Sequence, residues 1–286
     1  MRKLLRWTGY GIGGLAALTL LAVMGVLSMS QWVLSHGHAA QPEQLQPASP
    51  AQLADAPRQA KILGCVSCHG ENLGGREFLD VPNVVRIYAP NIPAIAARST
   101  DQQLALAIRR GVGHDGRNLF VMPSASYQRL SDGEVAALIA YIRGLPRGSG
   151  LTEGFSARPL GRVAIATGKL RPQVAKLAEY RLHGPVPAGA QHKAGQNLAG
   201  KYCADCHGPS LDGLTMESGD VSPDLTIAGA YDFDQFRTLM RTGKAAGNRE
   251  VGLMSKVARD DFSHLNDAEL RSIHGYLEAR AEKAGS

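Results

Sequence analysis

The sequence carries one pattern twice, and this repetition limits the possible folds more than any other feature. "GCVSCHG" at residues 64–70 returns as "YCADCHG" at residues 202–208. The similarity continues downstream in two further pairs of segments: "DQQLALAIRRG" (101–111) with "DFDQFRTLMRTG" (232–243), and "LSDGEVAALIAYIRGL" (130–145) with "LNDAELRSIHGYLEA" (265–279). A pattern shared along both halves of a chain indicates two copies of one module rather than one large domain.

Each copy is predicted to be helical. The stretch 101–111 begins after Thr100, a good N-cap, and ends at a glycine. Ser131 is followed three residues later by Glu134, the spacing of a capping box, and the second copy offers a similar signal. Neither an alternating strand pattern nor an Asn-Gly hairpin stands out. We therefore expect an all-α fold, with an N-terminal transmembrane helix followed by two tandem domains of one kind.

The N-terminal region is expected to be a membrane anchor. From Trp7 to Pro42 the chain has no Lys, Arg, Asp or Glu, and a bilayer is crossed by roughly 20 apolar residues. Three basic residues precede this stretch and the next one is Arg58, a bias that places the N-terminus in the cytoplasm and the rest outside. The alternative is a cleaved signal peptide, whose apolar region is normally shorter, about 7–15 residues. "HAAQ" at 38–41 is a poor cleavage site.

These features predict five segments along the chain. The net charge of +6, half of which lies in the first six residues, is too mild to indicate a nucleic-acid-binding protein. The segments are an anchor (1–35), a Pro/Gln/Ala-rich spacer (36–57), a first module (58–146), an inter-module segment (147–190) and a second module (191–286).

The Cys-x-x-Cys-His pattern has three possible uses: a zinc site, a redox dithiol or a covalently attached haem. A structural zinc needs a full tetrahedral set of ligands, and a histidine directly after a cysteine is poorly placed to share its metal. A thioredoxin-like dithiol expects a βαβ setting. Covalent haem explains all three residues, because the thiols form thioethers and the histidine binds iron. We predict two covalently bound haem c groups, with these residues: Cys65, Cys68 and His69 for the first, and Cys203, Cys206 and His207 for the second.

Two methionines are candidates for the other axial position. Met122 and Met254 each lie eleven residues after an equivalent glycine, Gly111 and Gly243. A thioether ligand opposite histidine leaves the iron no open position, which favours electron transfer over catalysis. The alternative is that each methionine merely fills core space. The remaining methionines are assigned to the anchor region, to core packing or to a position with no counterpart: Met1, Met24, Met29, Met240 and Met216.

The other histidines are expected to be surface or packing residues. His264 is the reserve ligand if Met254 does not bind iron. The remaining ones are His36, His38, His114, His183, His192 and His274.

At these motifs the sequence resembles class I c-type cytochromes. More narrowly, it resembles the membrane-anchored multihaem cytochrome subunits of bacterial periplasmic dehydrogenases. The resemblance covers roughly 50–145 and 190–280, and its specific stretches are "CVSCHG", "YAPNI", "RRGVGHDGRNLFVMP" and "YQRLSDGEVAALIAYIRGLP". Many such subunits carry three haems, whereas this chain has two motifs.

The resemblance implies a small helical fold wrapped around each haem. It implies that the cysteines bind haem covalently and that the histidines and the two candidate methionines bind iron. Pro90 and Pro223 would pack beside the proximal histidines. Tyr141 and Tyr276 would lie on a terminal helix that packs on the N-terminal helix of its module.

We expect an electron carrier rather than an enzyme, held at the outer, periplasmic face of the bacterial inner membrane. Electrons would come from a periplasmic dehydrogenase subunit or a quinol-side donor and pass to a downstream cytochrome or terminal oxidase. One alternative is a haem enzyme, such as a dihaem peroxidase or a thiosulfate-oxidising cytochrome. Another is an integral dihaem subunit of a terminal oxidase.

Overall fold

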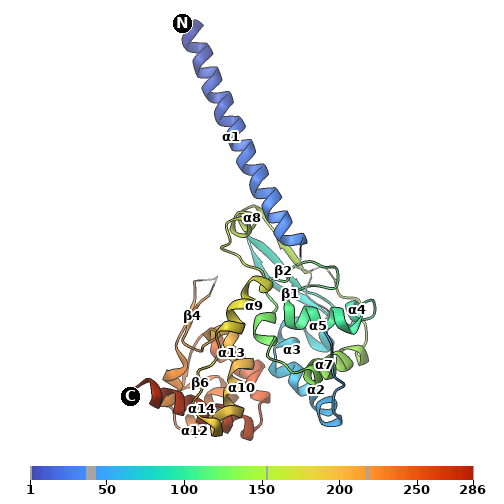
Figure 1. Cartoon of the computed structure of the whole chain (residues 1–286), viewed down its shortest axis with the longest axis vertical. Helices are drawn as coiled ribbons and strands as arrows, with labels where there is room; N and C mark the ends of the chain where they lie inside the picture. The colour runs from blue at the N-terminus through green and yellow to red at the C-terminus, as the bar shows by residue number, and fades with distance from the viewer. Residues whose placement is uncertain (1, 37–42, 153, 217–218, 286) are drawn as a thin grey trace.

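A long N-terminal helix stands out from a folded head (Figure 1). The structure is a computed structural model that describes residues 2–36, 43–152, 154–216 and 219–285. Helix α1 spans Arg2–Ser35, and its side chains are exposed along nearly the whole apolar stretch. Within the described residues, α1 is the helix that is long and apolar enough to cross a membrane, a test that a signal sequence also passes. His38 and the "HAAQ" stretch lie outside the described residues.

The first module is built around one hydrophobic core. Helix α7 packs against both α2 and α5. Its residues Val135 and Ile139 are fully buried in the core of this module. The expected N-cap at Thr100 and the expected capping box at Ser131 are present and begin α5 and α7, and Thr100 also forms a capping box with Gln103. Its helices are α2 (Pro50–Ile62), α3 (Cys65–His69), η1 (Glu71–Leu73), α4 (Ile92–Ala96), α5 (Asp101–Arg110), α6 (Ser124–Tyr127) and α7 (Asp132–Gly144).

Helix α2 begins inside the stretch that we expected to be an extended spacer. Ser49 caps it, with Gln52 completing a capping box and Pro50 in the first turn. These local signals favour a helix start, since proline is well accommodated there. Upstream, the carboxylate of Glu43 is buried and ion-paired with Arg109. Most of the described spacer therefore belongs to the first module.

The second module repeats this plan around its own core. Helix α10 crosses α14 so closely at Gly195 that a Cβ there would lie 1.8 Å from a carbonyl oxygen of α14. Tyr276 of α14 is fully buried, as α14 packs on α10. The helices are η2 (Ala190–His192), α10 (Lys193–Tyr202), α11 (Ala204–His207), η3 (Leu225–Ala230), α12 (Phe233–Thr242), α13 (Leu253–Asp260), η4 (Phe262–His264) and α14 (Asp267–Ala284).

The all-α expectation was incomplete, because the head also contains short antiparallel strands. A turn with Asn83 in the left-handed region (φ 62°) joins the first two strands. The strands are too short to show a periodic pattern, and one comes from a distant part of the chain. They are β1 (Arg76–Val81), β2 (Val85–Ala89) and β3 (Phe155–Ala157) in one sheet, and the pairs β4 (Leu214–Thr215) with β5 (Val221–Ser222) and β6 (Lys244–Ala245) with β7 (Arg249–Glu250).

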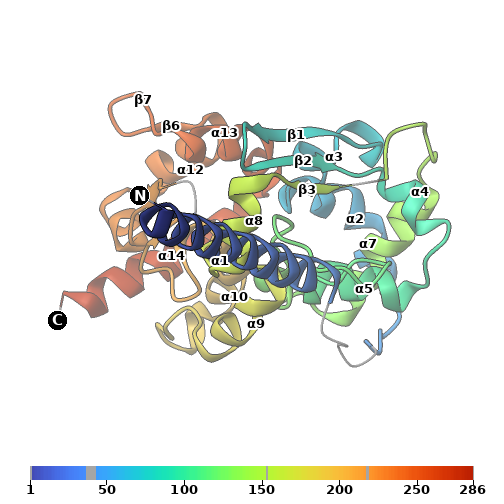
Figure 2. The same ribbon diagram turned by 90° about the horizontal axis from the view of Figure 1, so that it is seen from above.

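The inter-module segment packs across both modules. It supplies β3 to the first module's sheet, followed by α8 (Pro159–Ala166) and α9 (Gln173–Leu182). Helix α9 contacts α5 and α6, and its Tyr180 hydroxyl donates to the Ala204 carbonyl of the second module. Figure 1 shows α9 between the two modules and α8 at the top of the head, beside the lower end of α1, and Figure 2 gives the view from above.

The contact between the modules is built in the same way from both sides. Arg58 on α2 pairs with Glu269 of the second module at 2.7 Å, and Lys201 on α10 pairs with Glu134 of the first at 2.5 Å. Glu134 and Glu269 are equivalent capping-box residues. The N-terminal helix of each module is thus ion-paired with the first turn of the terminal helix of the other module. Such a reciprocal contact is the arrangement of a pseudo-twofold interface.

Candidate haem sites

The two cysteine pairs lie in short helices that follow the N-terminal helix of each module. Gly64, in the left-handed region at φ 72°, turns the chain from α2 into α3. All four cysteines are free thiols. Burial raises the pKa of Cys65 and of Cys203 to about 12, so these thiols are neutral near pH 7. A pair of half-buried, unpaired thiols in each module is available for covalent attachment.

Each histidine after a cysteine pair is held by a proline carbonyl. The Nδ1–H of His69 donates to the carbonyl oxygen of Pro90, and that of His207 donates to Pro223, both at 2.8 Å. A carbonyl oxygen can only accept, so Nδ1 carries the proton and Nε2 keeps its lone pair. Burial lowers the pKa of both histidines, which favours the neutral ring. Such a contact fixes the tautomer and orientation of a ligating histidine.

A glycine six residues after each histidine lets this contact form. A Cβ at Gly75 would lie 2.8 Å from the backbone nitrogen of Asn91, and one at Gly213 would lie 2.9 Å from the Ser222 carbonyl oxygen. Both glycines have positive φ, 91° and 97°. The amide of each also donates to the carbonyl of the preceding histidine. The equal spacing in both copies is a sequence signal that our sequence analysis missed.

Each candidate methionine packs on the same core as the cysteines of its module. Met122 lies in the irregular segment before α6 and contacts the first core together with Cys65. Met254 lies instead in the first turn of α13 and contacts the second core together with Cys203. The two methionines therefore come from different backbone settings but lie on corresponding cores.

Further polar side chains, which the sequence analysis did not single out, hold the methionine segments. Gln173 of α9 is buried, and its amide donates to the Phe120 carbonyl and accepts from the Ala125 amide. In the second module, Ser255 is fully buried, donates to the Gly243 carbonyl and accepts from the Val251 amide. Serine follows each methionine within two residues, whereas nothing local in the sequence points to Gln173.

The other described histidines have contacts of their own. His274 is buried against the rings of Phe233 and Phe236, and its Nε2 donates to the Tyr231 carbonyl. It is a packing residue, as expected. The reserve candidate His264 lies in η4, which packs on α2, and its carbonyl accepts from Arg58.

The two attachment segments lie at the interface between the modules. The carboxylate of Asp261, from the second module, lies within 3.5 Å of the Cβ position of Gly64 in the first. Its charge raises the pKa values of Cys65 and Cys68 in the first module and of Cys206 in the second. One buried carboxylate thus acts on both cysteine pairs.

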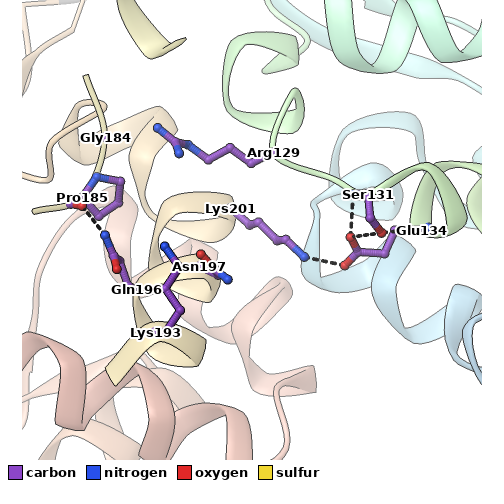
Figure 3. Close-up of a pocket in the computed structure, with 9 residues that line it drawn as sticks. All are labelled: Arg129, Ser131, Glu134, Gly184, Pro185, Lys193, Gln196, Asn197 and Lys201. Carbon is purple, nitrogen blue, oxygen red and sulfur yellow. Dashed lines mark hydrogen bonds and ion pairs between the residues drawn. The ribbon is translucent and has the colours of Figure 1, made fainter. Parts of the chain in front are cut away.

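A separate polar cavity of about 600 Å³ also lies between the modules (Figure 3). Its charged groups are directed at protein partners rather than toward one point. Lys201 pairs with Glu134, and Arg129 donates to the carbonyls of Tyr180 and His183. The cavity is part of the contact between the modules and does not contain the cysteine pairs.

The donor set fits covalent haem better than zinc. Within the part of the chain that the structure describes, no three His, Cys, Asp or Glu side chains converge as metal ligands. Each module instead offers two half-buried thiols, an oriented imidazole directly after them, and a thioether that packs on the same core as the first cysteine. This is the set of groups that binds haem c.

Comparison with known proteins agrees with this chemistry. Residues 51–146 match the cytochrome c family model. Across 78% of its length the chain is 27% identical to the fructose dehydrogenase cytochrome subunit of Gluconobacter japonicus. It is 26% identical across 79% to the gluconate 2-dehydrogenase cytochrome c subunit of Pantoea cypripedii. It is 24% identical across 77% to the cytochrome c subunit of alcohol dehydrogenase (quinone) from Gluconobacter oxydans.

The chain spans only 51–59% of the length of these relatives. The resemblance inferred from the motifs is nevertheless confirmed. Residues 51–146 match the cytochrome c family, and the chain as a whole is similar to the cytochrome c subunits of bacterial dehydrogenases.

Proposed function

We propose that this chain is a membrane-anchored dihaem cytochrome c. It passes electrons from a periplasmic dehydrogenase subunit or a quinol-side donor to a downstream cytochrome or terminal oxidase. The observation that carries the proposal is the twofold repetition of one ligand geometry, in which a histidine donates from Nδ1 to a proline carbonyl beside two free thiols. Bound haem c supplies a one-electron iron couple.

The residues of each module have the same roles in this proposal. The cysteine thiols would hold the haem covalently, and histidine Nε2 and methionine sulfur would supply the ligands of its iron. The proline carbonyls keep the imidazoles oriented, and burial favours their neutral form. The ligand sets are Cys65, Cys68, His69 and Met122 in the first module, and Cys203, Cys206, His207 and Met254 in the second.

The interface supports electron transfer directly between the two modules. The attachment segments share Asp261, and the Tyr180 hydroxyl of α9 donates to the Ala204 carbonyl between Cys203 and Cys206. Ion pairs on both sides of the pseudo-twofold axis hold the modules in one arrangement. A rigid contact keeps the distance between two redox centres constant.

Helix α1 supports a location in the bacterial inner membrane, with the head on the periplasmic side. Three basic residues precede its apolar stretch, which favours a cytoplasmic N-terminus. The relatives that the chain resembles are cytochrome subunits of fructose, gluconate and alcohol dehydrogenases. A dehydrogenase is therefore the partner that we propose.

The haem content of the purified full-length chain tests the proposal. We expect two haems per chain by the pyridine haemochrome assay, and one after Cys203→Ala with Cys206→Ala. Met254→Leu should abolish the low-spin His/Met signal of the second haem in paramagnetic resonance. The control Met240→Leu changes a buried methionine of the same core and should leave the signal unchanged.

Other outcomes would point elsewhere. A single haem in the unchanged chain would contradict the dihaem assignment. A high-spin haem with peroxide turnover would favour the dihaem peroxidase. An oxidase core as the stoichiometric partner in mild detergent would favour an oxidase subunit over a dehydrogenase subunit.

A further inference from the structure

The inter-module segment brings a short helix against the end of the N-terminal helix. Helix α8 contacts α1, and the guanidinium of Arg162 donates to the Ser30 hydroxyl at 3.2 Å and the Gln31 side-chain oxygen at 3.3 Å. In Figure 1, α8 is seen end-on beside the upright α1, so its axis runs across that helix rather than along it. A helix in this orientation lies flat where α1 meets the head.

One face of α8 is fixed to the head, and another face is apolar and uncovered. Gly161 and Ile165 are buried, and a Cβ at Gly161 would lie 2.0 Å from the Val84 carbonyl oxygen. On the uncovered face, Leu160 is 59% exposed and Val163 is 44% exposed. The close approach at Gly161 holds this apolar face in a defined orientation.

The sequence around α8 is basic, although two of its arginines lie beside carboxylates: Arg158 pairs with Asp80 at 2.6 Å, and Arg171 lies 3.8 Å from Glu179. Residues 154–178 contain five basic residues and no Asp or Glu, although the whole chain is nearly balanced, with 31 basic and 25 acidic residues. Lys169, in the turn after α8, is exposed. Exposed apolar side chains combined with basic residues are typical of helices that lie in the plane of a membrane surface and attract anionic headgroups.

The position of α8 along α1 matches the edge of a bilayer. A hydrocarbon core of about 30 Å takes up ~20 residues at ~1.5 Å per residue. Counted from Trp7, the apolar stretch would therefore leave the core near residue 26. Ser30 and Gln31, which contact α8, follow directly after that point, and the exposed Trp32 is suited to the interface.

We propose that α8 and the turn after it (158–171) rest on an anionic lipid surface, with Leu160 and Val163 in the headgroup region. This inference rests on the anchor in the proposed function. Helix α1 alone leaves the head free to tilt and rotate, whereas a second contact fixes its orientation. The interface between the modules is then held at one height above the membrane.

Spin labels in the full-length holoprotein test the proposal in nanodiscs that contain anionic lipid. The native cysteines are consumed by haem, so Val163→Cys introduces a single reactive thiol. Val186→Cys is the matched control, because Val186 is 53% exposed and lies on the second module's side. Leu18→Cys reports on the middle of α1. Unchanged visible spectra establish that the variants are folded.

We expect the Val163 label to collide with oxygen more often, and with a water-soluble nickel complex at least threefold less often, than the Val186 label. Equal nickel accessibility at both sites, with the Leu18 label in lipid, would overturn the inference and leave the anchor intact. A Val163 label shielded from both reagents would also overturn it, in favour of a protein partner. A Leu18 label in water would overturn the anchor itself.

Discussion

Asp261 is an ionisable group buried between the modules, and replacing it should change stability in a pH-dependent way. Asp261 is only 8% exposed, and its Oδ1 has no hydrogen-bond partner among the described residues. Burial raises its pKa from 3.8 to about 6, against the hydrogen bond from Ser67, with a further increase from Asp260 and a decrease from Lys256. The ionised carboxylate is therefore unfavourable in the folded state.

The size and sign of the effect follow from this pKa. The difference from 3.8 to about 6 is roughly two pKa units, or ~3 kcal/mol at ~1.4 kcal/mol per unit. A raised carboxyl pKa means that the folded state binds more protons than the unfolded state between about pH 4 and 6. The free energy of unfolding therefore falls as the pH rises through that window and is constant above it.

Asp261→Asn removes the ionisation while keeping the shape of the side chain. We expect the variant to be more stable than the original chain by up to ~3 kcal/mol at pH 7.5, with little difference at pH 4. Guanidinium titrations of the full-length holoprotein in detergent, followed by haem absorbance at both pH values, measure this. Asp260→Asn is the control, because Asp260 is a neighbouring carboxylate that is paired with Lys256 at the surface.

An equal gain at both pH values would contradict the ionisation argument, as would no gain at pH 7.5. A second readout is the midpoint potential of the haems. An ionised carboxylate beside the attachment segments favours the more positive, oxidised centre. The potentials should therefore fall as the pH rises from 5 to 7 in the original chain, and this slope should be weaker in Asp261→Asn.

Three further changes test the contacts that position the sites. Arg58→Gln breaks a charged hydrogen-bonded pair between the modules, and we expect a loss of about 1–3 kcal/mol in guanidinium titrations, with earlier separation of the modules under limited proteolysis. Gln173→Ala leaves the backbone around Met122 without its buried amide partner. On heating, the low-spin His/Met signal of the first haem should be lost at a lower temperature than in the original chain. The signal of the second haem should stay unchanged. Gly195→Ala places a Cβ against a carbonyl of α14 and should destabilise the second module by at least ~2 kcal/mol in thermal unfolding. In the control Gly275→Ala the added Cβ would lie 3.9 Å from its nearest neighbour, so this change should be neutral or stabilising.

The chemistry of the sites could be predicted from the sequence because it depends on neighbouring residues. Two thiols and a histidine within five positions are enough to predict a covalent haem attachment, whatever the rest of the fold does. The helix start at Ser131 was equally predictable, since a capping box joins residues only three positions apart. The repeat then extended both interpretations to the second half of the chain.

Only the tertiary structure determined how these groups are held. The resemblance placed Pro90 beside His69, but the structure alone shows that the Pro90 carbonyl, 21 residues away, accepts from Nδ1. Gln173 reaches the Met122 segment across about 50 residues. Strand β3 and the buried Asp261 come from still more distant parts of the chain. Local patterns do not encode such contacts, because they depend on which surfaces pack together once both modules and the segment between them have folded.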